Sequence, residues 1–230
     1  MKVALLLTLA AVLAAPAAAE RGESLYGRYC ARCHGGSGSG LADRGPSLQG
    51  VGARAADFYL RTGYMPLRQP GDQPRRHRSI LSSAQIDALV RYVASLGGGP
   101  RVPRPHPERG NVSEGMRLFT DHCAGCHQIA AVGGIVIGGR VPSLAQSSPV
   151  EVAEAVRIGP YLMPRFSRKQ ISDRELDSIV RYVQQTQSPK DAGGWAIGHL
   201  GPISEGLVAW LVAGTALLLI SALIGRRARS

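Results

Sequence analysis

The chain has 230 residues, which allows one or two domains, and only 5% of them are aromatic. Two small cores with so few aromatic side chains would be thinly filled, because small domains bury a limited share of their surface. The formal net charge of +11 favours an acidic partner or an anionic surface, and a solvated basic face explains it equally well.

The N-terminus has the parts of a secretory signal peptide over residues 1–19. Lys2 supplies a positive charge, an apolar run extends to Ala15, and an A-x-A sequence stands before Glu20. The apolar core is short for a bilayer span, and an uncleaved N-terminal anchor is the alternative reading. Export would place the rest of the chain outside the cytoplasm, where nucleic acid is not an expected partner.

A C-x-x-C-H sequence occurs twice, at residues 30–34 and at residues 123–127, and the two copies contain all four cysteines of the chain. This sequence is the attachment signature of c-type haem, in which two thiols bind the porphyrin and the adjacent imidazole becomes the proximal iron ligand. Two covalently bound haem c groups are therefore predicted, on Cys30, Cys33, Cys123 and Cys126. The alternatives are a redox dithiol and a shared zinc site, and neither needs a histidine after both pairs.

Residues 20–97 are predicted to form the first haem domain. A helix over residues 22–33 would place the first pair of thiols on its apolar face. A second helix, over residues 80–97, begins with Ser82 and Gln85, which have the spacing of a capping box. A basic cluster at residues 75–78 has no evident partner and is interpreted as a solvated loop.

Between these helices, Met65 precedes Pro66, and a proline pushes the residue before it into an extended conformation. An extended loop can direct the thioether toward the iron face opposite His34, because His and Met form an axial pair that raises the reduction potential. The alternative for a single methionine before a proline is the packing of a gap in the core.

Residues 98–110 are rich in proline and glycine, so a linker that is neither helix nor inner strand is predicted there. The second haem domain is predicted over residues 111–190, because this half repeats the first in order. Its Met163 again precedes a proline, and Ser172 and Glu175 again form a capping box. A glycine-rich insertion at 131–140 accounts for the unequal spacing of the two halves.

The repetition strengthens the prediction of axial ligation, because a Met-Pro sequence follows each attachment motif at a similar distance. Pro46 and Pro142 also occupy equivalent places, and a backbone carbonyl near each could accept the histidine ring N–H and fix its tautomer. The predicted iron ligands are His34 and Met65 in the first domain, and His127 and Met163 in the second.

A transmembrane helix is predicted over residues 206–225, after a segment at 191–205 that leads into the membrane. The charges of the tail at 226–230 place the C-terminus in the cytoplasm, and the haem domains on the other side of the cell membrane. The alternative, a buried core helix, would need a larger domain than the chain provides. The predicted fold is all-α, with two tandem class I cytochrome c-like domains and one C-terminal anchor.

The chain resembles the dihaem cytochrome c subunit of the actinobacterial-type cytochrome bcc complex, a menaquinol–cytochrome c reductase. The resemblance rests on D-R-G-P-S-L at 43–48, G-V-G at 50–52, G-P at 159–160, M-P-R-F-S at 163–167 and G-P with E-G at 201–206. It implies a cytochrome b subunit and a Rieske iron–sulfur subunit as partners, with electrons delivered to a copper-containing cytochrome c oxidase. It also implies that the chain is the electron-transfer subunit of a proton-translocating reductase, without substrate chemistry of its own.

Single-electron relay through two His/Met haems is the function that these features predict. A membrane-anchored dihaem carrier that serves a different dehydrogenase or oxidase is the nearest alternative, because residues 22–190 alone do not name a partner. A dihaem peroxidase would need one haem with an open iron position, and the two Met-Pro loops argue against it. A binding module without haem is the remaining alternative.

Overall fold

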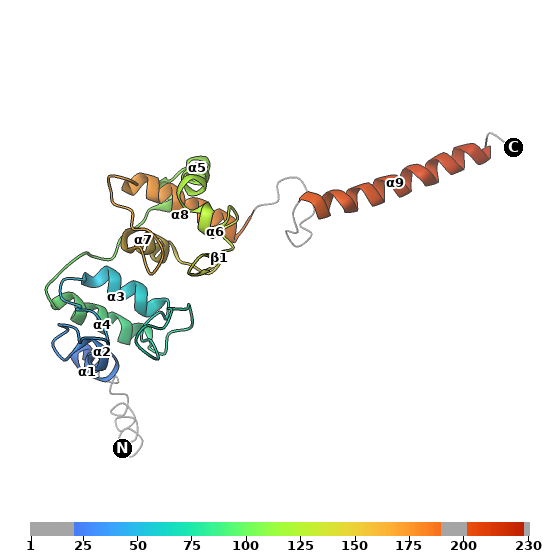
Figure 1. Ribbon diagram of the computed structural model, residues 1–230. Helices are drawn as coiled ribbons and strands as arrows, with labels where there is room; N and C mark the ends of the chain where they lie inside the picture. Colours follow the sequence, from blue (N-terminus) through green and yellow to red (C-terminus); the bar gives the residue numbers. More distant parts are fainter. Residues whose placement is uncertain (1–20, 190–201, 228–230) are drawn as a thin grey trace, which may run out of the picture. The chain divides into compact units, whose positions relative to one another are not determined.

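The computed structural model describes residues 21–189 and 202–227 of the chain. It contains two compact units, Met1–Gln187 and Ser188–Ser230. The predicted signal peptide, most of the segment that leads into the membrane and the last three residues of the tail lie outside the described residues. Within the first unit the helices form two lobes, named here the first lobe (residues 21–97) and the second lobe (residues 107–187) (Figure 1).

The first lobe is a set of helices around one apolar core. It contains α1 (Gly22–Tyr29), α2 (Ala31–His34), α3 (Gly52–Arg61) and α4 (Ser83–Ser95). Both α1 and α3 pack against α4. The core is formed by buried apolar side chains that include Leu25, Tyr26, Leu60, Ile86, Leu89 and Val93.

The second lobe repeats this arrangement. It contains the 3₁₀ turn η1 (Pro107–Arg109), α5 (Val112–His122), α6 (Ala124–His127), α7 (Pro149–Ile158) and α8 (Asp173–Gln187). The helices α5 and α8 pack closely, as α1 and α4 do in the first lobe. Its core includes Leu118, Phe119, Val156, Ile171, Ile179 and Val183.

The predicted capping boxes are both confirmed. The Ser82 hydroxyl accepts a hydrogen bond from the Gln85 backbone N–H, and the Gln85 side chain accepts one from the backbone N–H of Ser82. Ser172 and Glu175 form the same reciprocal pair before α8. These bonds satisfy backbone donors that have no partner inside the helix, and they therefore define where α4 and α8 begin.

The single helix predicted over residues 22–33 is wrong in one respect, because the chain bends at Cys30. The φ and ψ angles of Cys30 are −120° and −39°, away from regular helix values, and they separate α1 from the short α2. Cys123 bends the chain between α5 and α6 in the same way, with φ −124° and ψ −35°. The first cysteine of each motif thus lies at a corner between two helices.

The linker at 98–110 also needs a correction, because it contains the turn η1, which begins with a proline. Proline is tolerated at a first helical position, where the missing N–H costs nothing. This segment packs on α8: the backbone N–H of His106 donates to Asp177 at 2.7 Å, and Arg181 donates to the Pro107 carbonyl at 3.3 Å.

The glycine-rich insertion at 131–140 forms most of a short antiparallel hairpin. Its strands are β1 (Gly134–Val136) and β2 (Gly139–Val141), and Ile135 pairs with Arg140. Ile135 on β1 and Ile137 at the tip of the hairpin are both largely exposed. The hairpin is a small addition to an otherwise helical pair of lobes.

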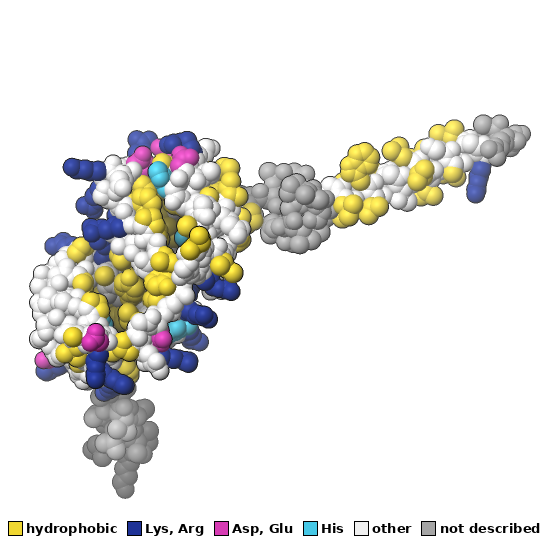
Figure 2. Space-filling view, viewed as in Figure 1, with side chains coloured by type: hydrophobic (Ala, Val, Ile, Leu, Met, Phe, Trp, Pro, Cys, Tyr) yellow, Lys and Arg dark blue, Asp and Glu magenta, His cyan; other side chains and the backbone are white. Residues whose placement is uncertain are grey.

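The two lobes contact each other through α3 and α7, which the sequence patterns had not predicted as helices. The basic cluster at 75–78 takes part, so its interpretation as a solvated loop without a partner is wrong for Arg76. The Arg76 guanidinium donates to both carboxylate oxygens of Glu151, at 3.0 and 3.1 Å, and Glu151 belongs to α7. Most other cationic side chains lie on the outer surface of the lobes (Figure 2).

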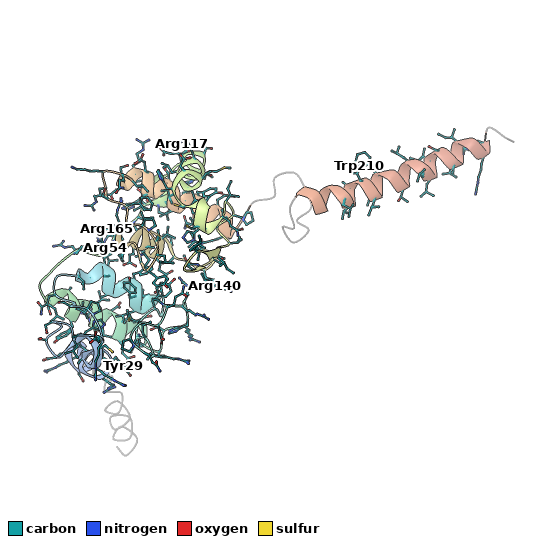
Figure 3. All side chains as sticks on the ribbon, in the orientation of Figure 1. Tyr29, Arg54, Arg117, Arg140, Arg165 and Trp210 are labelled. Atoms are coloured by element: carbon teal, nitrogen blue, oxygen red, sulfur yellow. The ribbon has the colours of Figure 1, made fainter. Side chains whose placement is uncertain are left out.

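The helix α9 (Pro202–Arg227) belongs to the second unit. Its segment Gly206–Arg227 has 22 residues and contains an 18-residue window with a mean hydropathy of 2.5, and no other helix in the described ranges is both long and apolar enough to cross a membrane. Its apolar side chains are exposed, as expected for a surface that faces lipid (Figure 2). Trp210 projects from its N-terminal half (Figure 3), and aromatic side chains of this kind are enriched at membrane interfaces.

Candidate haem-binding sites

The first attachment motif occupies the corner between α1 and α2. Cys30, Cys33 and His34 are all half-buried there. The His34 ring atom Nδ1 lies 2.8 Å from the carbonyl oxygen of Pro46. If Nδ1–H donates to this carbonyl, Nε2 is left with a free lone pair, which is the form of imidazole that binds a metal.

The second attachment motif has the same local geometry. His127 Nδ1 lies 3.2 Å from the carbonyl oxygen of Pro142, so in both lobes the predicted proline carbonyl lies within hydrogen-bond distance of the histidine ring. His127 is buried, and burial lowers the pKa of its ring because the charged form loses its hydration. A neutral imidazole with Nδ1–H engaged is again the form that can offer Nε2 to iron.

The first cysteine of each motif is a poor candidate for a redox dithiol. Burial raises the pKa of Cys30 to about 11 and that of Cys123 to about 12, which disfavours the thiolate. A reactive thiol needs a lowered pKa, since the thiolate is the nucleophile. No disulfide joins any of the four cysteines.

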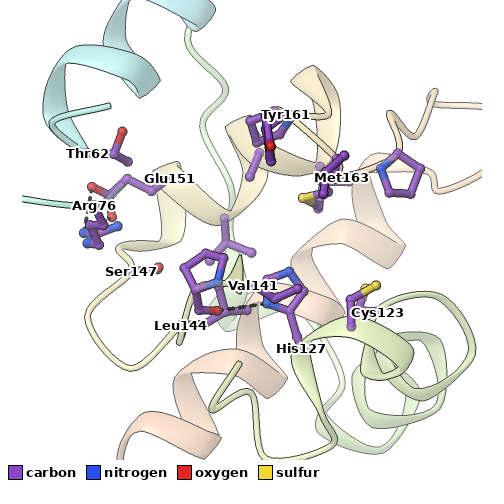
Figure 4. Close-up of a pocket in the computed structure, with 18 of the residues that line it drawn as sticks. Thr62, Arg76, Cys123, His127, Val141, Leu144, Ser147, Glu151, Tyr161 and Met163 are labelled. Carbon is purple, nitrogen blue, oxygen red and sulfur yellow. Dashed lines mark hydrogen bonds and ion pairs between the residues drawn. The ribbon is translucent and has the colours of Figure 1, made fainter. Parts of the chain in front are cut away.

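The two methionines lie in the loops that follow α3 and α7, and the backbone N–H of Met163 closes a turn on the Pro160 carbonyl. Met65 is half-buried and packs against the first core, and Met163 is half-buried against the second. In the second lobe, the ligand candidates His127 and Met163 and both thiols of the motif line one cleft (Figure 4). The structure therefore brings these four predicted residues together.

The cleft holds about 1270 Å³ of empty space, part of which is open to solvent. Its walls are mainly apolar, with lining residues that include Val141, Leu144, Val152, Val156, Leu162 and Ile179. Ligand pockets in proteins are lined mostly by apolar side chains with a few polar groups that fix the ligand. A cleft with this lining, and with an imidazole, a thioether and two thiols in its walls, fits a haem c group.

Comparison with known proteins agrees with this geometry. The family described as "Cytochrome C oxidase, cbb3-type, subunit III" matches residues 17–93 and 110–183. The cytochrome bc1 complex cytochrome c subunit of Corynebacterium diphtheriae is 34% identical over 226 residues, which cover 90% of this chain and 80% of that protein. The corresponding subunit of Mycobacterium bovis is 36% identical over 216 residues, covering 90% and 77%.

The chain belongs to the family of cytochrome bc1 complex cytochrome c subunits. Each of the two segments that match the oxidase-subunit family contains one C-x-x-C-H motif, so the chain has two cytochrome c domains. The family and the mainly helical, two-domain fold expected from the sequence are therefore confirmed. A cbb3-type cytochrome c oxidase subunit of Azospirillum sp. is also similar, at 29% identity over 70% of this chain and 60% of that protein.

In this member of the cytochrome c subunit family, sequence patterns missed part of the second site. Residues of the first lobe line the same cleft as His127: they are Phe58, Thr62, Tyr64, Gln73, Pro74 and Arg76. No local motif places them there, because they reach the cleft only through the packing of α3 on α7. Glu151, the partner of Arg76, also lines the cleft, and its capping sequence with Ser148 was the one local signal for α7.

Proposed function

We propose that this chain is the membrane-anchored cytochrome c subunit of a quinol–cytochrome c reductase and relays single electrons through two haem groups. The observation that carries the proposal is the doubled attachment motif, each copy with its imidazole oriented by a proline carbonyl, in a chain of this family. The thiols that hold the two groups are Cys30, Cys33, Cys123 and Cys126. The iron ligands are His34 and Met65 in the first domain, and His127 and Met163 in the second.

Haem c, when bound, supplies a one-electron couple whose potential depends on its axial ligands and its surroundings. The chain supplies orientation and exclusion of water. Pro46 and Pro142 hold the histidine rings in one tautomer, which leaves Nε2 as the ligand atom. The apolar walls of the second cleft lower the local dielectric, and they keep water from the iron position that Met163 would occupy.

The domain organisation that we propose has haem domains at 20–97 and 111–190, a linker at 98–110 and a transmembrane helix at 206–225. The signal peptide at 1–19 would be removed after export. Arg226 and Arg227 close the apolar helix, and their charges orient the C-terminus toward the cytoplasm. Both haem domains then face the extracytoplasmic side of the cell membrane, anchored by a single span.

The partners in this proposal are a cytochrome b subunit, a Rieske iron–sulfur subunit and a copper-containing cytochrome c oxidase. Quinol oxidation takes place on the partner subunits, and this chain makes no bond to a substrate. Because both haem domains are tethered to one anchor, their effective concentration near the partners exceeds that of a diffusing carrier. The reductase as a whole is a proton-translocating enzyme.

Two measurements test the proposal. The mass of the mature chain should exceed that of the polypeptide by two haem groups, and a Cys30→Ala/Cys33→Ala variant should carry one. A mature chain with four free thiols and no added tetrapyrrole would overturn it. Extraction in mild detergent through a tag on this chain should then recover a cytochrome b and a Rieske protein. Recovery of an oxidase without either of them would instead favour the role of an oxidase subunit, which the family match to residues 17–93 and 110–183 also allows.

A further inference from the structure

The cleft of the second lobe has one wall that belongs to the first lobe. Phe58 of α3 lines this wall. Thr62, directly after the end of α3, and Tyr64 and Gln73 of the loop that follows also line it. Phe58 and Tyr64 contact each other edge to face, with ring centroids 5.6 Å apart. Tyr64 also directly precedes Met65, the proposed ligand of the first haem. The surroundings of the second haem are therefore built from both lobes.

The contact includes a charge pair at the edge of the cleft. Glu151 lines the cleft, and its side chain is only 10% exposed. Arg76 of the first lobe donates to both of its carboxylate oxygens (Figure 4). It also donates to the carbonyl oxygen of Gln146, at 3.0 Å. Arg140, the other cationic side chain of the lining, is exposed to solvent.

Glu151 is fixed in place independently of Arg76. It is the third residue of α7, and its carboxylate accepts a hydrogen bond of 2.8 Å from the backbone N–H of Ser148 in the capping box. A carboxylate held in this way cannot turn toward solvent without exposing the start of the helix. Its negative charge therefore remains beside the second cleft, and the nearest countercharge comes from the other lobe.

We propose that the first lobe tunes the second haem, with Arg76 acting as a positioning residue that neutralises the charge of Glu151 beside it. This inference rests on the proposed function, because it requires a haem in the second cleft. A negative charge near a haem favours the ferric state, and at the edge of an apolar cleft such a charge is weakly screened. Contact between the lobes then keeps the potential of the second haem higher than it would be in a separate lobe.

The test is a redox titration of the full chain in detergent, with the absorbance of both haems followed. A Met163→Ala variant identifies which of the two redox waves belongs to the second haem. We expect Arg76→Gln to lower the potential of that wave and to leave the wave of the first haem unchanged. This pattern is specific, because Arg76 belongs to the first lobe and a merely local defect would move the wave of the first haem.

Three further variants complete the experiment. Arg75→Gln, which removes the same charge from the exposed neighbouring position, should move neither wave. Glu151→Gln keeps a side chain that can close the capping box and should raise the potential of the second haem. The double variant should lie closer to the wild type than either single variant, because the two charges cancel.

The inference is overturned if Arg76→Gln moves the first wave, moves neither wave, or acts no more strongly than Arg75→Gln. It is also overturned if Glu151→Gln lowers the potential of the second haem. A preparation that shows no redox waves in any variant would contradict the proposed function itself, so the two failures are distinguishable.

Discussion

The hydroxyl of Tyr26 donates a buried hydrogen bond of 2.8 Å to the carbonyl oxygen of Gly35, the residue that follows His34, the proposed proximal ligand of the first lobe. In the second lobe the position of Tyr26 is occupied by Phe119, which has no hydroxyl. There the hydroxyl of Tyr182, on α8, donates instead to the carbonyl oxygen of Ile129, at 2.7 Å. In each lobe a tyrosine hydroxyl thus binds the loop after the histidine. The tyrosine belongs to the first helix, α1, in the first lobe and to the last helix, α8, in the second.

Removal of either hydroxyl should destabilise its own lobe. Tyr26→Phe leaves the Gly35 carbonyl without its partner, and an unsatisfied buried acceptor costs roughly 1–3 kcal/mol. Tyr182→Phe should have a similar effect on the second lobe. Denaturant titration, followed at the thioether–iron band of each haem, would report which lobe is weakened. Tyr92→Phe is the control, because no hydrogen bond of the Tyr92 hydroxyl is found among the described residues, and it should change little.

Two glycines allow the terminal helices of each lobe to cross closely. A Cβ atom at Gly22 would collide with the carbonyl oxygen of Ala88, and one at Gly115 would collide with that of Ser178. Gly22→Ala and Gly115→Ala should each lower the free energy of unfolding, by about 1–3 kcal/mol if the helices shift apart. Gly27→Ala is a matched control on α1, since its Cβ would meet no atom within 4 Å. An equal loss in all three variants would contradict this account of the crossing.

The two proposed axial ligands, Met65 and Met163, are tested separately. Met65→Ala should abolish the near-infrared thioether–iron band of one haem and lower its potential, because the thioether favours the ferrous state. Met163→Ala should do the same for the other haem. Met116, which is exposed on α5, provides a control whose replacement should leave both bands intact. Unchanged spectra and potentials in both variants would show that the axial assignment is wrong.

Glu154 makes the stability depend on pH. It is fully buried on α7, and no described residue hydrogen-bonds its carboxylate oxygens. Burial raises its pKa from the usual 4.5 to about 9. The charged groups around it are Asp57, Arg61 and Arg54 of α3 and Glu151 of its own helix.

The native state then holds a proton at Glu154 that the unfolded chain releases between pH 4.5 and about 9. The free energy of unfolding should therefore fall as the pH rises through this window. Glu154→Gln, which cannot ionise, should show a flatter profile in denaturant titrations across the same range. A variant whose profile still parallels that of the wild type would assign the pH dependence to other groups.

Sequence patterns were sufficient to predict the features whose signal is local and occurs in both halves of the chain. The two motifs, the Met-Pro loops and the boxes at Ser82 and Ser172 each lie within a few residues, and the repetition reinforced each interpretation. The helix α3 was not predicted, although its sequence is amphipathic and Phe58 and Leu60 on it are buried. Ser148 and Glu151 form a capping box at the start of α7, and their spacing is a local sequence signal for this helix that the prediction did not use.

Other features have no local signal. Arg76 and Glu151 are 75 positions apart, and nothing in either neighbourhood indicates that they meet. The pairing depends on how α3 packs on α7, which is a property of the folded pair of lobes. The hydrogen bonds of Tyr26 and Tyr182 also have no local signal in the sequence. They start from helices that are not equivalent in the two lobes, so aligning the two halves of the sequence does not reveal them.

The shared wall of the second cleft bears on how the chain matures. Residues 58–76 are synthesised before the second attachment motif, and domains generally fold in the order of synthesis. We therefore expect the second cleft to be completed against a neighbour that has already folded. We expect cofactor loading to follow chain order, and deletion of the N-terminal half to leave the other half with an open, hydrated cavity.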